Sequence, residues 1–405
     1  MTAIVSILNK HAVAIAADSA VTFGRKVVNS GNKIFTLSKY HPIAIMTYNN
    51  ASFMGIPWDT VIKLYRKQLG DAELDTVDAY VDDFMAYLHK PELYNQEECK
   101  ESITSTIASF YQMMINTTKR DLSGFDVNAS NAYDGVRATL LKYKGIFQGV
   151  AKNKEFMGFT YSDFIAQNTE SIENFKQWSK MVPIPDSDYD TLLETYYEHL
   201  LINDFYDCYS GLGFAGFGAK ELFPSSVLVL LWEKMGDRIK YSRGETLRIG
   251  NGEPAARIVP YAQIKVEQTI VRGIHPDIRN LIFNCFNNIL GLIGGKIPGF
   301  DAKVYTELFE KQIDDYIQAK HTGPLMDTIV NLDKVDMADM AESIVYLTSL
   351  MKRVSPEEET VGGPVDVAVL SKGDGFIWMK RKHYFQPELN PHFFSNYFRK
   401  EQEDE

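Results

Sequence analysis

Cysteine is scarce in this sequence. Only three cysteines occur among 405 residues, Cys99, Cys208 and Cys285, and none has the close paired spacing of zinc sites or disulfide frameworks. We therefore interpret all three as reduced residues of the core. The eight histidines are also scattered, and no two of them have the helical spacing of a metal site. The sequence accordingly predicts no metal and no cofactor.

Long apolar runs are absent as well. No stretch approaches the roughly 18 consecutive apolar residues of a membrane-spanning helix. The N-terminus lacks the charged and then apolar pattern of a signal peptide. A phosphate-binding loop of the Walker type is also missing, because the Gly-Gly-Lys-Ile-Pro-Gly run at 294–299 lacks its spacing and is better interpreted as a helix stop. We expect a cytoplasmic chain with no membrane partner.

Basic residues are fewer than acidic ones. The chain has 42 Lys and Arg against 53 Asp and Glu, which gives a net charge of -11 at pH 7. No basic block stands out from this acidic background, so a nucleic-acid partner is disfavoured. The 45% of hydrophobic residues are enough for a substantial core. The sequence therefore predicts a globular protein.

The first 70 residues have the pattern of strands followed by a helix. Apolar runs rich in β-branched residues predict strands over 4–8, 12–17, 33–37 and 43–48. The segment 56–69 has apolar residues at helical spacing, so we expect it to pack on the sheet. Two successive hairpins and one covering helix are implied.

The rest of the chain changes character twice. Residues 70 to about 205 are rich in Tyr, Asp, Glu and Lys with helical periodicity, which predicts a mainly helical insertion. Strand patterns return afterwards, then helical ones, and last a hairpin; the ranges are 213–217, 227–232 and 238–241, then 278–289, 304–316 and 337–348, then 365–370 and 376–382. This order predicts helices layered on sheets in one α+β core.

Three residues near the N-terminus could form a reactive site. A first turn centred on 9–10 would place Thr2 opposite Ala17, with Asp18 one step along. Lys33 begins the third predicted strand, and its ammonium could reach both residues if that strand starts at the same edge. Such a site would unite a hydroxyl, an α-amine, a lysine and a carboxylate.

Each of these groups has a chemical reason to be there. A Thr hydroxyl is a weak nucleophile at neutral pH, but an α-amine with a pKa of about 7.7 to 8.0 can accept its proton. This base exists only after Met1 is removed. A neighbouring lysine ammonium would lower the pKa of the amine and the hydroxyl, and Asp18 would hold that lysine in place.

The opening Thr2-Ala-Ile-Val-Ser-Ile and the later Ala-Ala-Asp18-Ser resemble the start of N-terminal-nucleophile (Ntn) hydrolases, in particular HslV and proteasome β-type threonine peptidase subunits. The resemblance implies that Thr2 attacks, that Lys33 tunes it and that Asp18 positions the lysine. It also implies a four-layer αββα sandwich. Its core would comprise 2–70 and 206–385, with a helical insertion at 71–205 and a tail at 386–405.

The same resemblance implies further site residues. Asn49 stands where the family has a glycine whose backbone N–H stabilises the oxyanion, and Asn tolerates unusual backbone conformations. Glu358 occupies the place of a supporting acidic residue. Two family serines are not reproduced, because Val361 and Ala262 stand in their places. The proton relay must therefore differ from that of the family.

The resemblance implies a threonine-type peptidase that forms an acyl-enzyme on Thr2. A homo-oligomer is then expected, with a ring as one arrangement, and any ATP-dependent unfoldase would be a separate chain. Two alternatives remain open. The first is an amidase acting on a small amide or peptide, and the second is a non-catalytic scaffold whose helical insertion binds a partner.

Overall fold

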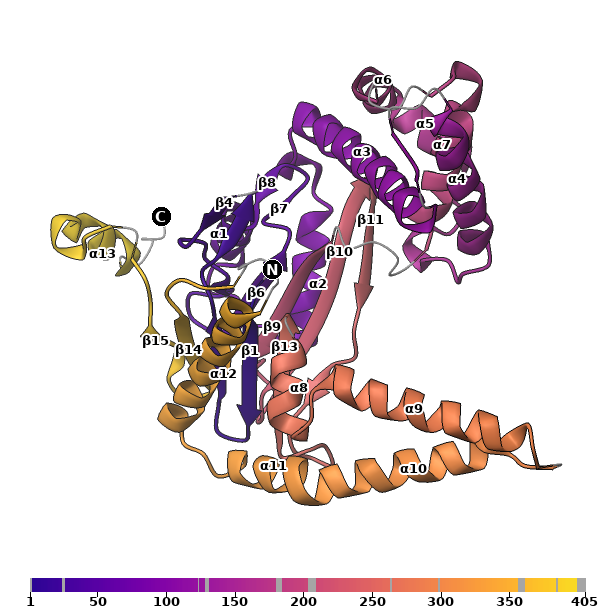
Figure 1. Ribbon diagram of the computed structural model, residues 1–405. Coiled ribbons are helices and arrows are strands. Elements are labelled where there is room, and N and C mark those ends of the chain that lie inside the picture. The colour runs from indigo at the N-terminus through magenta and orange to yellow at the C-terminus, as the bar shows by residue number, and fades with distance from the viewer. Residues whose placement is uncertain are drawn as a thin grey trace.

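The computed structural model describes residues 2–23, 26–122, 124–127, 131–179, 184–202, 209–262, 264–297, 299–355, 361–383 and 385–398. Helices and antiparallel strands both contribute to it, which confirms the predicted α+β class (Figure 1). Within these ranges, no helix has both the length and the apolar character needed to cross a membrane.

The two ends of the chain meet in one five-stranded antiparallel sheet. Its strand order is β13-β1-β2-β14-β15. The bounds are β1 Ile4–Asn9, β2 Val13–Ala17, β13 Ala256–Ala262, β14 Asp366–Ser371 and β15 Gly375–Lys380. The first and last predicted hairpins are thereby confirmed, and β14 pairs directly with β2.

A second antiparallel sheet has the order β11-β10-β9-β6-β5, with β12 also paired to β10. The bounds are β5 Ile34–Thr36, β6 Ile43–Asn49, β9 Ser210–Gly216, β10 Ser225–Met235, β11 Arg238–Arg243 and β12 Leu247–Arg248. Two short hairpins, β3 Val21–Phe23 with β4 Lys26–Val28 and β7 Ser52–Phe53 with β8 Ile56–Pro57, lie outside both sheets. The sequence pattern did not predict these short hairpins.

The register of the first hairpin differs from the prediction. Ile4, and not Thr2, lies opposite Ala17. The cause is the side chain of Asn9, whose Oδ1 accepts the backbone N–H groups of the residues two and three positions later, at 2.9 and 3.2 Å. Asn9 is thus the last strand residue and the turn lies at 10–11, one residue later than expected.

Both sheets contribute to one buried apolar cluster, so they face each other. The first sheet supplies Ile4, Leu8, Val13, Ile15, Ala17, Ala368 and Leu370, and the second supplies Ala44, Met46, Tyr48 and Ala215 together with Ile34. Burial of these apolar side chains stabilises the pair of sheets by about 25 cal/mol for each Å² removed from water.

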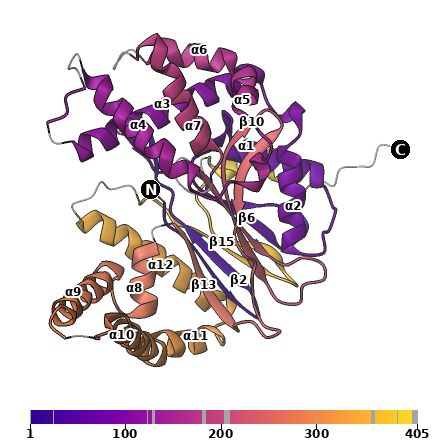
Figure 2. The ribbon, with the colours of Figure 1, turned by 90° about the vertical axis from the view of Figure 1, so that its right-hand side faces the viewer.

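Helices cover the outer face of each sheet. The predicted helix after residue 56 is α1, Trp58–Leu69, and it buries Val61, Ile62, Tyr65 and Leu69 as expected. Next to it lies α2, Val77–Leu88, whose N-cap Thr76 accepts the N–H of Ala79 at 3.1 Å. On the other sheet lies α12, Lys334–Val354, which ends where the sequence predicted. Figure 2 shows α12 and α2 on opposite sides of the strands.

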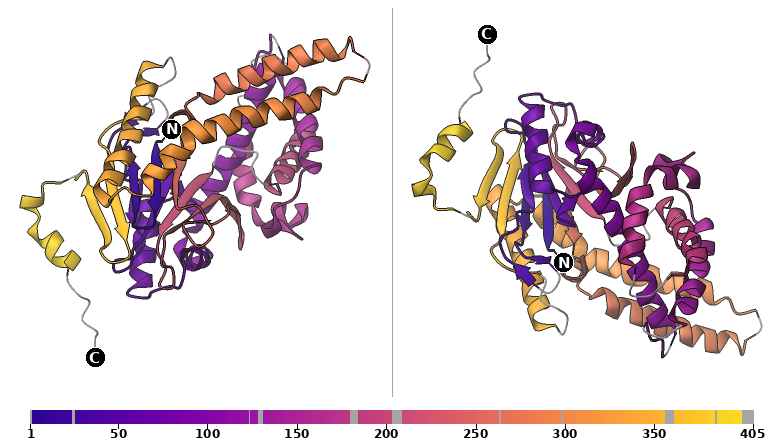
Figure 3. Two further views of the ribbon diagram at one scale, coloured as in Figure 1. Left: turned by 90° about the horizontal axis from the view of Figure 1, so that it is seen from below. Right: turned by 90° about the horizontal axis from the view of Figure 1, so that it is seen from above.

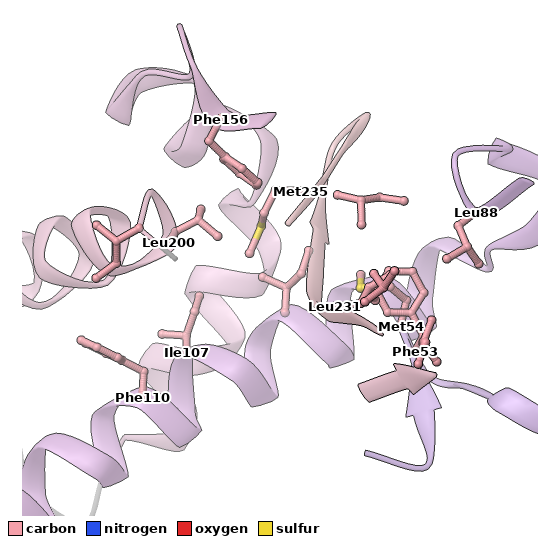
Figure 4. Close-up of a cluster of buried hydrophobic side chains, with 14 of the residues drawn as sticks. Phe53, Met54, Leu88, Ile107, Phe110, Phe156, Leu200, Leu231 and Met235 are labelled. Carbon is pink, nitrogen blue, oxygen red and sulfur yellow. The ribbon is translucent and has the colours of Figure 1, made fainter. Parts of the chain in front are cut away.

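The segment predicted as a helical insertion forms further helices that pack on one another. They are α3 Gln96–Asp121, α4 Ala132–Gln148, α5 Tyr161–Gln167, α6 Thr169–Trp178 and α7 Tyr189–Leu200, with short 3-10 turns at 91–93, 154–156 and 186–188. Their apolar side chains continue the core of the second sheet, as Figure 4 shows around Leu231 and Met235 of β10. The helices are therefore attached through a shared core.

A long helical hairpin projects from the body (Figures 1 and 3). Its arms are α9 Pro276–Gly294 and α10 Ala302–Ile317, with α8 Ile264–Arg272 before them and a π-helical turn at 318–322 and α11 Gly323–Ile329 after them. The predicted apolar face of α9 is exposed, with 54% of Ile278 and 54% of Ile289 accessible. This face has no covering element among the residues described.

The cysteine interpretation is also wrong in part. Cys99 and Cys285 are both free thiols as predicted, but Cys285 on α9 is exposed, whereas Cys99 is half-buried and packs against the core cluster of the second sheet. Cys208 lies outside the described residues. The chain ends in a 3-10 turn at 387–389 and in α13, Pro391–Phe398.

Candidate active site

Asp18 is the centre of a buried polar site at the end of β2. Its side chain is 1% exposed, and its two oxygens accept four hydrogen bonds. Oδ1 accepts the backbone N–H of Ala3 at 2.8 Å and Nζ of Lys33 at 2.6 Å. Oδ2 accepts the N–H groups of Ala20 at 3.2 Å and Gly362 at 3.1 Å. One carboxylate therefore connects segments from both ends of the chain.

Lys33 lies just before β5 of the facing sheet and is also buried, with 4% exposure. Its carbonyl accepts the N–H of Thr47 at 2.9 Å, which fixes its backbone beside β6. Burial lowers the pKa of Lys33 below its ordinary value of 10.5, although the contact with Asp18 opposes this change. The ammonium of Lys382 adds to the lowering of this pKa. Lys33 therefore loses its proton at a lower pH than a lysine in water does.

Thr2 is positioned through its neighbour Ala3. The N–H of Asp18 donates to the Ala3 carbonyl at 3.1 Å, while Ala3 donates to the Asp18 side chain. Ala3 therefore shares an oxygen of Asp18 with Lys33, and Thr2 is one peptide bond away. Thr2 itself is 8% exposed. The register shift moves the position opposite Thr2 by two residues. Asp18 and Lys33 are nevertheless in contact, and Thr2 adjoins Ala3, which binds Asp18.

Asn49 has the backbone conformation that the prediction allowed for. It ends β6 with φ of 69°, in the left-handed region that Asn tolerates better than most residues. It lies two residues beyond Thr47, whose N–H binds the Lys33 carbonyl, so it is at the same end of the second sheet as Lys33. Its role as an oxyanion donor remains a prediction.

Three positions remain from the family resemblance: Glu358, and Val361 and Ala262 in the places of the two serines. Glu358 lies outside the described residues. Val361 is buried, and its carbonyl accepts the hydroxyl of Ser349 at 3.3 Å. Ala262 lies opposite Ile4 in the first sheet. Valine and alanine bring no hydroxyl to these two places.

Sequence reasoning missed three polar residues around Asp18. Ser19 is fully buried, donates its hydroxyl to the Pro364 carbonyl and donates its N–H to the Gly362 carbonyl at 3.1 Å. Asp366 lies opposite Ala17 in β14 and forms an ion pair with Lys382. The available signal was an aspartate that opens the strand Asp366–Ser371 and precedes a run of four apolar residues.

Open hollows elsewhere on the surface do not coincide with this site. Two of about 550 and 480 Å³ lie along α3, and Ser109 and Gln112 line both. Neither contains Thr2, Asp18 or Lys33. In the part of the chain that the structure describes, no group of three or more His, Cys, Asp or Glu side chains has the arrangement of a metal site. We therefore place the candidate site by its chemistry, at Asp18.

Comparison with known proteins gives a structural likeness only. No protein family and no curated protein matches the chain. Among solved structures, it is similar to an Anbu mutant (Gly-1) from Hyphomicrobium sp. strain MC1, with 7% identity, a TM-score of 0.30, and coverage of 98% of this chain and 94% of that one. Anbu (ancestral beta-subunit) from Yersinia bercovieri is similar at 9% identity and a TM-score of 0.28, with coverage of 97% and 94%.

The helical assembly of the Anbu complex from Pseudomonas aeruginosa is similar at 8% identity and a TM-score of 0.34, covering 98% of this chain and 93% of that one. The resemblance to HslV and proteasome β-type peptidase subunits is therefore corrected, since the structural neighbours are Anbu proteins. None of these descriptions names an ATP-driven unfoldase. Because these TM-scores are below 0.5, the proposals below depend on the geometry of the chain itself.

Proposed function

We propose that the chain is a threonine-type Ntn hydrolase that cleaves amide bonds of peptides. The observation that carries this proposal is the shared Oδ1 of Asp18, which binds both the N–H of Ala3 and Nζ of Lys33 in a buried site. Through this oxygen the segment that follows Thr2 is joined to a lysine whose pKa is lowered by burial, which supports Thr2 as the nucleophile. A free N-terminal threonine in that position has both a nucleophile and a base.

The chemistry follows from these groups. After Met1 is removed, the α-amine of Thr2 accepts the hydroxyl proton while Oγ attacks the carbonyl carbon of the substrate. The N–H of Asn49 would stabilise the oxyanion. The C–N bond then breaks, the proton passes to the leaving amine, and water hydrolyses the ester on Thr2. Glu358 stays an expected support for this site.

The fold supports the same proposal. Two facing sheets with helices on their outer surfaces have the arrangement expected of an αββα sandwich. We propose 2–70 and 206–385 as the core and 71–205 as the helical insertion. In this division α2 is the helix that joins the insertion to the sheet, because its Phe84 packs on Phe214 of β9 with ring centroids 5.6 Å apart.

We also propose that the chain associates with a second copy of itself. Two apolar surfaces are exposed on separate elements: Ile278, Leu281, Ile289 and Leu292 on α9, and Tyr346, Leu347, Leu350 and Met351 on α12. The hairpin that bears the first surface extends away from the body (Figure 3). Surfaces of this kind are typical of protein interfaces.

Light scattering tests this association. Leu281→Glu with Leu292→Glu should reduce the molar mass to that of the monomer, whereas the matched pair Lys303→Glu with Lys311→Glu, on α10, should leave it unchanged. A wild-type protein that is monomeric at micromolar concentration would overturn the proposal.

Hydrolysis of a peptide library by wild type, Thr2→Ser and Thr2→Ala tests the catalytic proposal. Serine keeps the attacking oxygen, so activity should fall in the order wild type, Ser, Ala, with the Ala variant at background. Cleavage of small amides without cleavage of longer peptides would select the amidase alternative. Equal turnover in all three variants would refute Thr2 as the nucleophile, and no turnover at all would favour the scaffold.

A further inference from the structure

A second buried carboxylate lies beside Asp18. Asp366 opens β14 and faces Ala17 of β2, the residue just before Asp18. The residue is 3% exposed. Because paired residues of adjacent strands lie about 5 Å apart, the backbone that carries Asp18 and the backbone that carries Asp366 are direct neighbours. The mechanism proposed above does not use Asp366.

Lys382 holds this carboxylate with two groups. Its backbone N–H donates to Oδ1 of Asp366 at 2.9 Å, and its Nζ donates to Oδ2. The side chains of Lys382 and Asp366 are 12% and 4% exposed. One residue thus binds both oxygens, which fixes the ammonium of Lys382 at the end of the first sheet.

A buried ion pair of this kind needs a reason other than stability. The cost of removing two charges from water often equals or exceeds their attraction, so apolar replacements of similar volume are frequently neutral or stabilising. The neighbouring positions of β14, Val367, Ala368 and Val369, are apolar and buried. The ion pair therefore lies at the end of β14 that is next to Asp18.

The ion pair of Lys382 and Asp366 also bears on the protonation of Lys33. Asp18 stabilises the protonated form of Lys33 through an ion pair at 2.6 Å. Lys382, bound to Asp366 on the strand that pairs with β2, opposes that form by like-charge repulsion. Asp366 holds Lys382 in place through their ion pair. Asp18 thus raises the proton affinity of Lys33, and Lys382 lowers it.

We propose that Lys382 is a positioning residue of the active site, whose fixed charge keeps Lys33 able to relay the Thr2 hydroxyl proton to the α-amine. The inference rests on the hydrolase function proposed above. In the relay, the hydroxyl proton passes to neutral Nζ of Lys33 while another Nζ proton passes to the α-amine, so Lys33 is unchanged. This relay takes the place of the hydroxyls missing at Val361 and Ala262.

Three variants test the proposal. Lys382→Met removes the charge, Lys382→Arg keeps it, and Arg381→Met removes the charge of the adjacent exposed residue, which packs on Trp378 instead. Their folding is compared by circular dichroism. The pKa of Lys33 is then measured by ¹³C NMR in a Thr2→Ala background, so that this readout needs no catalysis. Lys382→Met should raise that pKa, while Lys382→Arg and Arg381→Met should leave it unchanged.

The rate of acylation of Thr2 by a β-lactone, measured against pH, completes the test. Loss of the charge should move the acidic limb to higher pH, with the plateau retained, and acylation at pH 7 should slow by about tenfold for each pH unit that the limb moves. If Lys382 had only a structural role, Lys382→Met would lower the plateau rate of acylation without moving the acidic limb. That result would overturn the proposal. A wild type that is acylated while Lys33 titrates identically in all variants refutes the role of Lys382 and leaves the hydrolase function standing. A wild type that is not acylated at any pH refutes the hydrolase function and the relay with it.

Discussion

Replacing Asp18 by Asn should be among the most destabilising changes in the first sheet. The carboxylate is buried and accepts four hydrogen bonds, one of them from the buried ammonium of Lys33. An Asn side chain keeps one acceptor and turns the other into a donor that faces N–H groups, while Lys33 loses its counter-charge. Removing one partner of a buried ion pair typically costs about 3 to 5 kcal/mol. We expect a loss of this size.

The matched variants separate the charge from the hydrogen bonds. Lys33→Met leaves Asp18 with three backbone donors, Ala3, Ala20 and Gly362, so it should cost less, about 1.5 to 3 kcal/mol for the charged hydrogen bond. The double variant should cost less than the sum of the two single changes, because the two residues are in contact. Urea unfolding followed by circular dichroism measures all three free energies.

The pH dependence supplies a second check. The folded pKa of Lys33 is lowered from 10.5, so between the two pKa values the unfolded chain binds the additional proton. The free energy of unfolding contributed by Lys33 therefore rises with pH in that window, by at most about 1.4 kcal/mol per pH unit. Lys33→Met should lack this rise. A loss below about 1 kcal/mol in Asp18→Asn, with additive single changes, would refute the coupled site.

Two further predictions concern other parts of the fold. Burial raises the pKa of Glu267, beside the hairpin, to about 7, so stability falls as pH rises from 4.5 through 7. Glu267→Gln should therefore be more stable than wild type at pH 8 by about 1 kcal/mol after screening by solvent, and equal at pH 4.5, in urea titrations; an equal difference at both pH values would contradict this. Phe84→Ala should lose about 3 to 5 kcal/mol, because Phe84 is fully buried against Trp58 and Tyr65. Calorimetry showing an unchanged Tm would contradict the packing of α2 on the second sheet.

The strands of the first 50 residues, and the proximity of Ala3 and Lys33 to Asp18, could be predicted because their signals are local. Alternating and β-branched runs identify β1, β2, β5 and β6, and the order of Thr2, Asp18 and Lys33 along them brings the three into one region. The exact register could not be predicted, because it depends on whether Asn9 ends the strand or begins the turn. The two backbone N–H groups that donate to its Oδ1 decide that question.

Other features depend on tertiary contacts that a periodic pattern does not contain. The face of α9 has the spacing of a core helix, yet Ile278 and Ile289 are exposed because the hairpin leaves the body. Lys382 lies 364 positions after Asp18 in the sequence and meets its neighbourhood only because β14 pairs with β2. The role proposed for it therefore could not be inferred from the sequence.

Intact-mass spectrometry after treatment with a threonine-reactive β-lactone tests the central claim most directly. We expect a protein that has lost Met1 and gains a single adduct, which peptide mapping places on Thr2 and which disappears in Thr2→Ala. Active protein that retains Met1, or an adduct that persists in Thr2→Ala, would contradict the claim.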